Sequence, residues 1–282
     1  MIPDTFQYAA PETLAEAVAV LAADPASVAL AGGNGLLTLL KRGELGPTTV
    51  VDLRKLDVLR GLAVREDGRL RAGALTTLTE LCDNPTVRAA HIPGVLGDAV
   101  DSAGDQQARN RATIGGTLAS AAPGSDVSAA LLVLEATADI VGPNGSRVAT
   151  VAGMLDGSES LAPGELITAV TLAPAEPGSA YCRLANRANL HAIVGVAVTL
   201  AFGRNGAITR CRIAVTGALT IPQRLSETES AVIGARPPVP LAIQSGLYYV
   251  EDSFASAAYR EYMTGRLAER AFASAVARAR NA

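Results

Sequence analysis

The sequence has few of the residues that bind metals or form disulfides. Its 282 residues include three cysteines, two histidines and no tryptophan. Cys82, Cys182 and Cys211 form no CxxC pair, so the chain is not expected to hold an iron–sulfur cluster or a structural zinc by itself. An odd number of widely spaced cysteines is typical of reduced thiols in a cytoplasmic protein. With His91 and His191 as the only histidines, a metal catalyst is not expected either.

Charge and long apolar runs are also scarce. Charged residues make up 18% of the chain and the net charge is −3, so no basic stripe is available to bind nucleic acid. No apolar run reaches the roughly 20 residues that a membrane span needs. The N-terminus lacks the basic and apolar regions of a secretory signal. Hydrophobic residues reach 49%, which supports a sizeable core in one large domain or in two to three small ones.

Periodicity in the first third of the chain predicts a small αβαβ unit. Apolar residues recur at helical spacing after Pro11, and short β-rich runs follow. The expected elements are a helix at 11–23, a strand at 27–30, a helix at 36–42 and a strand at 49–53.

The pattern then changes to hairpins and later to long strands and helices. Asp67-Gly68 and Asn144-Gly145 each separate two short β runs, which is the signal of a hairpin. A stretch with Pro and Gly at 174–178 is the best linker candidate. The other expected helices are 76–82, 95–103, one capped by Ser125 or Asp126 and running to 135, 224–233, 241–250 and 256–280; the other expected strands are 164–172, 195–202 and 207–217.

A first glycine-rich loop lies between an expected strand and an expected helix. It reads Ala31-Gly32-Gly33-Asn34-Gly35-Leu36. Glycines let backbone N–H groups point at one spot, and a helix N-terminus favours an anion there. A Rossmann site is a rival interpretation, with Asp52 as the acid about 20 residues on. It is disfavoured because Thr38 stands where the third glycine belongs and because hairpins follow.

A second glycine-rich loop, Thr113-Ile114-Gly115-Gly116-Thr117, follows Arg109-Asn110-Arg111. Its paired glycines are also expected to expose N–H donors. Two such loops about 80 residues apart fit a long cofactor that must be held at more than one place. Each loop could instead be an ordinary tight turn, and Arg109 and Arg111 could form an ordinary salt bridge.

Ordered sequence segments add a specific resemblance. They are FQY at 6–8, AGGNGLL at 31–37, VVDLRKL at 50–56, ARNRATIGGTLASAAPGSDVSAALLVLEA at 108–136, GELITAV at 164–170, VGVAVTL at 194–200 and SFASAAYREYMTGRLAERAF at 253–272. Together they resemble the FAD-binding (medium) subunit family of the molybdenum hydroxylases, which includes the carbon monoxide dehydrogenase flavoprotein and the FAD part of xanthine dehydrogenase. The resemblance spans nearly the whole chain in the family's order.

The resemblance implies an α+β fold: a two-part FAD-binding module of the vanillyl-alcohol-oxidase type, then a small C-terminal domain of antiparallel sheet and helices. The implied domains are 1–56, 57–175 and 176–282. The implied FAD contacts are Ala31, Gly32, Gly33, Asn34, Gly35 and Leu36 on the pyrophosphate, Thr113, Gly115, Gly116 and Thr117 in the second loop, Asp126 near the ribose, Leu166 or Ile167 beside a ring system, and His191 beside the flavin. The chain departs from the family pattern at Gly35, Thr117, Cys182 and His191.

The function implied is electron transfer by an FAD subunit. A partner subunit would hold molybdopterin and another would hold iron–sulfur clusters, with NAD, oxygen or a quinone as the final acceptor. No acid–base residue is predicted to be catalytic, because the flavin performs the chemistry. The first alternative is a stand-alone FAD-dependent oxidoreductase with His191 as a proton carrier. The second is a non-catalytic scaffold without FAD.

Overall fold

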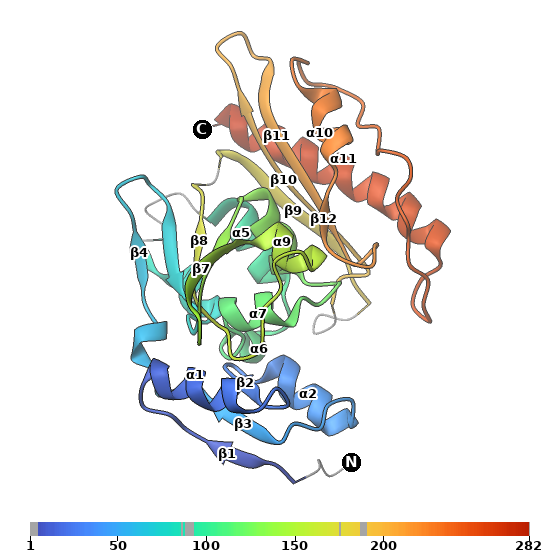
Figure 1. Cartoon of the computed structure of the whole chain (residues 1–282). Helices are drawn as coiled ribbons and strands as arrows, with labels where there is room; N and C mark the ends of the chain where they lie inside the picture. The colour runs from blue at the N-terminus through green and yellow to red at the C-terminus, as the bar shows by residue number, and fades with distance from the viewer. Residues whose placement is uncertain (1–4, 86, 88–92, 175, 187–190, 282) are drawn as a thin grey trace.

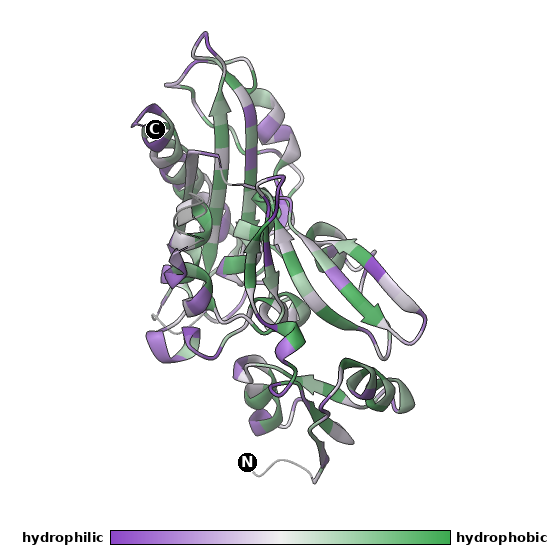
Figure 2. Cartoon of the chain, turned by 90° about the vertical axis from the view of Figure 1, so that its left-hand side faces the viewer, coloured by the Kyte–Doolittle hydropathy of each residue, from purple (hydrophilic) through white to green (hydrophobic). Residues whose placement is uncertain are grey.

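The computed structural model describes residues 5–85, 87, 93–174, 176–186 and 191–281. Three β-sheets follow one another along the molecule, with the N-terminal unit at one end and the C-terminal sheet at the other (Figure 1). Hydrophobic residues are concentrated on the strands of the second and third sheets (Figure 2). No helix in the described residues could cross a membrane.

The first unit is a parallel three-stranded sheet in the order β1-β3-β2. Its elements are β1 (Gln7–Ala9), α1 (Leu14–Ala23), β2 (Val28–Leu30), α2 (Asn34–Arg42) and β3 (Thr49–Asp52). Helix α1 begins three residues later than predicted because Thr13 caps it in a capping box with Glu16. Helix α2 begins two residues earlier than predicted, directly after Gly33. The αβαβ prediction is confirmed, although it missed β1.

The second unit is an antiparallel five-stranded sheet in the order β4-β5-β8-β6-β7. Both predicted hairpins are present, as β4-β5 and β6-β7. The strands are β4 (Leu62–Val64), β5 (Leu70–Gly73), β6 (Thr137–Gly142), β7 (Gly145–Thr150) and β8 (Leu166–Leu172). The helices of this part are η1 (Asp57–Leu59), α3 (Leu78–Asp83), α5 (Pro93–Ser102), α6 (Gln106–Arg109), α7 (Ile114–Ser120), α8 (Asp126–Val133) and α9 (Val151–Asp156).

The third unit is an antiparallel sheet in the order β12-β11-β10-β9. Its elements are β9 (Gly178–Leu184), β10 (Val194–Phe202), β11 (Ile208–Thr216), β12 (Gln223–Arg224), α10 (Ser226–Val232) and α11 (Ala257–Asn281). Helix α11 packs against β9 and β10, and α5 and α8 of the second unit also pack against this sheet (Figure 1). Every residue of α8 is therefore buried.

Two predictions about the C-terminal half need correction. The helix expected at 241–250 is absent, and this segment is extended, with an isolated bridge between Leu219 and Tyr249. Pro237, Pro238 and Pro240 precede it and Gly246 adopts a φ of +77°, which are conditions that oppose a helix. Strand β9 was missed because its residues follow directly on the predicted linker.

Candidate functional site

The first glycine loop has unused hydrogen-bond donors. Strand β2 ends at Leu30 and α2 begins at Asn34, with Gly33 between them at a φ of +91°. Among the described residues, the backbone N–H groups of residues 31–36 have no hydrogen-bond partner. The last three of them form the first turn of α2, where the helix dipole favours negative charge. This row of donors has the chemistry that a phosphate group requires.

The outer side of this loop is open. Asn34 and Gly35 are exposed, and a Cβ placed on Gly35 would meet nothing within 4 Å. Gly33 is needed for a different reason, because its left-handed backbone is strained for residues with a side chain. The loop therefore presents its amides to space that a ligand can occupy.

The second glycine loop does not expose its donors as predicted. The N–H groups of residues 114–117 donate to Thr76 O (3.0 Å), Ala74 O (3.0 Å), Thr113 Oγ1 (3.2 Å) and Thr113 O (2.9 Å), in that order. Thr113 is the N-cap of α7. Gly115 is required by packing, since a Cβ there would lie 2.6 Å from the Cβ of Ala74. The amides of this loop thus hold α7 against the second sheet.

The structure brings the two loops together. Arg111 Nη2 donates to Gly32 O at 3.2 Å, and Asn34 Nδ2 donates to Ala108 O at 2.9 Å. A Cβ on Gly116 would lie 3.7 Å from the Cβ of Ala31. The two segments are separated by about 80 residues in the sequence, and their contact is a property of the tertiary fold.

Asp126 lies in the first turn of α8, which is capped by Ser125. It is 4% exposed. Tyr181 Oη donates to its Oδ1 at 2.6 Å, and Arg183 Nη1 donates to its Oδ2 at 2.8 Å. Burial raises the pKa of this carboxyl, while the Tyr181 hydrogen bond and the Arg183 charge oppose that rise. Sequence reasoning did not identify Tyr181 or Arg183, because nothing in the sequence shows that β9 passes this carboxylate.

The remaining predicted residues occupy three different environments. Leu166 and Ile167 of β8 are buried, the first in the core of the first unit and the second in the core of the second. His191 is exposed, and a Cβ on Gly124 would meet its Cβ at 2.7 Å. Thr117 is partly exposed in α7. Cys182 packs partly buried against the C-terminal core.

Asp52, the acid of the rival Rossmann interpretation, is buried at the end of β3. It is 4% exposed and accepts hydrogen bonds from Tyr8 Oη at 2.5 Å and Arg54 Nη2 at 2.6 Å. The Arg54 guanidinium lowers the pKa of Asp52 to about 2. The residue ties β1 to the end of β3, and both of its carboxylate oxygens already accept hydrogen bonds.

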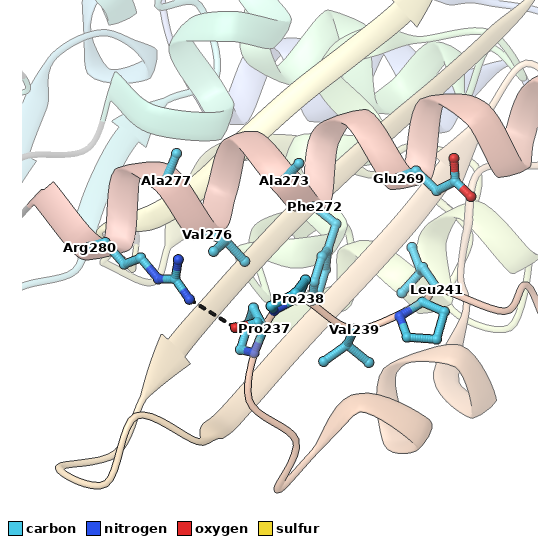
Figure 3. Close-up of a pocket in the computed structure, with 11 residues that line it drawn as sticks. Pro237, Pro238, Val239, Leu241, Glu269, Phe272, Ala273, Val276, Ala277 and Arg280 are labelled. Carbon is cyan, nitrogen blue, oxygen red and sulfur yellow. Dashed lines mark hydrogen bonds between the residues drawn. The ribbon is translucent and has the colours of Figure 1, made fainter.

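A cavity of about 560 Å³ lies elsewhere, in the C-terminal unit (Figure 3). Residues 237–241 form one wall and α11 forms the other, with Phe272 and Val276 pointing inward. Its lining is mostly apolar and includes no residue of either glycine loop. The described residues also contain no group of three or more His, Cys, Asp or Glu side chains that could hold a metal.

Comparison with known proteins identifies both parts of the chain. Residues 4–175 match the FAD binding domain in molybdopterin dehydrogenase, and residues 179–275 match the CO dehydrogenase flavoprotein C-terminal domain. The carbon monoxide dehydrogenase medium chain of Hydrogenophaga pseudoflava is 31% identical over 290 residues, which cover 99% of each chain.

Two solved structures share the fold. A chain of reconstituted CO dehydrogenase from Oligotropha carboxidovorans superimposes with a TM-score of 0.91 at 30% identity, covering 99% of this chain and 100% of the other. A chain of quinoline 2-oxidoreductase from Pseudomonas putida 86 gives a TM-score of 0.89 at 26% identity, with 99% of both chains covered.

These matches define an FAD-binding flavoprotein subunit of an oxidoreductase complex. The chain belongs to the family of FAD-binding medium subunits of molybdenum hydroxylases. The family and α+β fold predicted from the sequence are confirmed, and so is FAD as the cofactor.

Proposed function

We propose that this chain is the electron-transfer subunit of a molybdenum hydroxylase. It takes electrons from iron–sulfur clusters in a small partner subunit, while a large partner subunit holds molybdopterin and oxidises the substrate. Electrons leave to NAD, oxygen or a quinone. Cys82, Cys182 and Cys211 lie in α3, β9 and β11, too scattered to ligate a cluster together, which supports a cluster on a partner. Bound FAD supplies the redox chemistry.

The observation that carries this proposal is the row of free amides at residues 31–36. Ala31, Gly32, Gly33, Asn34, Gly35 and Leu36 would hold the diphosphate of FAD. The donor set fits because a diphosphate is an extended anion and the loop offers successive N–H groups at a helix N-terminus. Arg111, which contacts Gly32, adds positive charge beside the same loop.

The other predicted residues have supporting roles in this proposal. Thr113, Gly115 and Gly116 hold α7 beside the first loop, and Thr117 lies partly exposed in the same helix. Leu166 and Ile167 supply buried apolar surface near the rings. Asp126, in the first turn of α8, would lie near the ribose, and His191, exposed beside Gly124, would face the flavin. We also propose domain limits of 1–56, 57–175 and 176–282, which separate the three β-sheets.

Competition binding tests the diphosphate site directly. FAD is titrated into the apoprotein and followed by flavin fluorescence, with ADP and adenosine as competitors. ADP should displace FAD and adenosine should fail to do so, because only ADP carries the diphosphate. Equal competition by both compounds would contradict the assignment of residues 31–36 as the diphosphate site. Failure of the chain to bind FAD at all would remove the proposed function.

A second measurement separates the proposed complex from a stand-alone enzyme. The FAD-loaded chain is mixed with small organic substrates in the absence of oxygen, and flavin absorbance is recorded. No bleaching is expected without partner subunits. Bleaching by a substrate alone would replace the proposal with direct substrate oxidation by this chain.

A further inference from the structure

The C-terminal unit holds one short segment of the FAD-binding part by three backbone carbonyls and one carboxylate. The segment is 123–126, which joins α7 to α8. Each carbonyl of residues 123–125 accepts a hydrogen bond from a residue at the end of β11 or just before β10. The bonds are Gly217 N to Pro123 O (2.7 Å), Thr216 Oγ1 to Pro123 O (2.7 Å), Thr216 Oγ1 to Ser125 O (3.1 Å) and Ala192 N to Gly124 O (3.1 Å).

The last residue of this segment, Asp126, is held by its side chain. Tyr181 and Arg183 of β9 each donate to one carboxylate oxygen. The contact is closely fitted, since a Cβ on Gly195 of the neighbouring strand would lie 2.0 Å from Tyr181 Oη. Strand β10 therefore leaves the space that the Tyr181 hydroxyl needs to reach Asp126.

We propose that Tyr181 is a positioning residue for FAD. Through Asp126 it fixes segment 123–126, and with it α7 and the second glycine loop, against the first loop. Docking of the C-terminal unit thus completes the FAD site, although that unit contributes none of the free amides. This inference rests on the proposed FAD site at residues 31–36.

The two hydrogen bonds from Tyr181 and Arg183 depend on the charge of Asp126. An ionised carboxylate accepts hydrogen bonds from both Tyr181 and Arg183, whereas a protonated one loses the ion pair. Burial raises the pKa of Asp126, and the Tyr181 hydroxyl counteracts this by stabilising the ionised form. The titratable and charged groups facing Asp126 are Tyr181 and Arg183 from β9 and His191 from the segment before β10.

Tyr181→Phe tests the inference while retaining the ring that fills the core. We expect the FAD dissociation constant of this variant to rise about tenfold, or about 1.4 kcal/mol. The loss should grow as the pH is lowered, because without the Tyr181 hydrogen bond the ionised form of Asp126 is less stabilised. Tyr249→Phe is the matched control, since it removes a phenol from the same unit away from Asp126, and it should bind FAD as the wild type does.

Three readouts separate positioning from a purely structural role. FAD affinity is measured by fluorescence at each pH, and urea unfolding of the apoprotein is measured in parallel. Because His191 also faces Asp126, the pH series is repeated with His191→Gln in the wild type and in Tyr181→Phe. A structural role would lower apoprotein stability and leave FAD affinity unchanged across the pH series. That result, with wild-type FAD binding intact, would overturn the inference and leave the proposed function standing.

A second variant covers the case in which Tyr181→Phe does not fold. Asp126→Asn retains the shape of the side chain but cannot titrate. Its FAD affinity should be weak and should not change as the pH is lowered, whereas wild-type affinity should fall on acidification. Equal, pH-independent affinity in both proteins would overturn the inference.

Discussion

The backbones of Gly32, in the first glycine loop, and Arg111, just before the second, lie in contact. A Cβ on Gly32 would be 1.9 Å from the carbonyl oxygen of Arg111 and 2.8 Å from its carbonyl carbon. Arg111 also donates from Nη2 to Gly32 O at 3.2 Å. Because the obstacle is backbone, no rotamer change can relieve it, and the spacing of the two loops depends on this glycine.

Gly32→Ala should push the loops apart. We expect a loss of about 2 kcal/mol in the free energy of unfolding, as for other overpacked sites, and an FAD affinity at least about tenfold weaker. Gly265→Ala in α11 is the matched control, because its Cβ would meet nothing within 4 Å and it lies outside both glycine loops. Urea unfolding and FAD titration of both variants measure the effect. Equal behaviour of the two would show that loop spacing does not matter for the cofactor.

Arg54→Gln tests the buried carboxylate that ties β1 to β3. Asp52 has its pKa lowered to about 2 in the folded protein, chiefly by Arg54, against about 3.9 when unfolded. A depressed folded pKa contributes stability above about pH 4 and loses it as the pH falls toward 2. The Arg54 side chain is 47% exposed, so we expect the variant to lose only about 1 kcal/mol.

This loss should be present at pH 5–8 and should shrink as the pH falls from about 4 through about 2. Urea unfolding across the pH series measures it. Arg42→Gln, which breaks an exposed pair with Glu44, provides the control. A gap between wild type and Arg54→Gln that stays constant down to pH 2 would contradict the assigned cause.

Thr113→Val tests the role of the second glycine loop in holding α7. The Thr113 hydroxyl caps the helix by accepting from Gly116 N at 3.2 Å, and valine keeps the shape without the acceptor. We expect a loss of about 1 kcal/mol in unfolding free energy. Thr209→Val, at an exposed strand position, should change stability little. If both variants are equally stable, the cap contributes nothing measurable.

Arg260→Met tests the core of the C-terminal unit. Arg260 is 3% exposed on α11 and donates from Nη1 to Ile193 O (2.6 Å) and Gly217 O (2.7 Å), the strand ends that hold segment 123–126. Removing it leaves two buried carbonyls without donors, so a loss of about 3 kcal/mol is expected. Arg266→Met, which breaks an exposed pair on the same helix, should cost under about 0.5 kcal/mol. Thermal unfolding compares them, and similar melting temperatures would refute the prediction.

Elements that depend on local sequence were largely predictable. The two hairpins follow from Asp67-Gly68 and Asn144-Gly145, and α11 follows from its apolar periodicity. The helix expected at 241–250 was wrong because apolar spacing there serves an extended segment that covers the C-terminal core. Strand β9 was missed because its ends carry no turn signal distinct from the linker.

In the candidate site, too, the local features were predictable from the sequence and the tertiary contacts were not. The glycine loop at 31–36 could be found from the sequence, because strand, glycines and helix are local features. The sequence could not show that the similar loop at 113–117 uses its amides internally, since their acceptors on Ala74 and Thr76 lie about 40 residues away in the chain. Nor could it reveal that Asp126 is reached by Tyr181 and Arg183 from another unit.

By itself, the sequence determined the family, most of the order of elements and the position of the first glycine-rich loop between a strand and a helix. Only the tertiary structure decided which donors remain free, which carboxylates are buried and which unit holds segment 123–126. The physical reason is that backbone conformation is set largely by neighbouring residues, whereas the partner of a buried polar group is set by chain segments that meet only after packing.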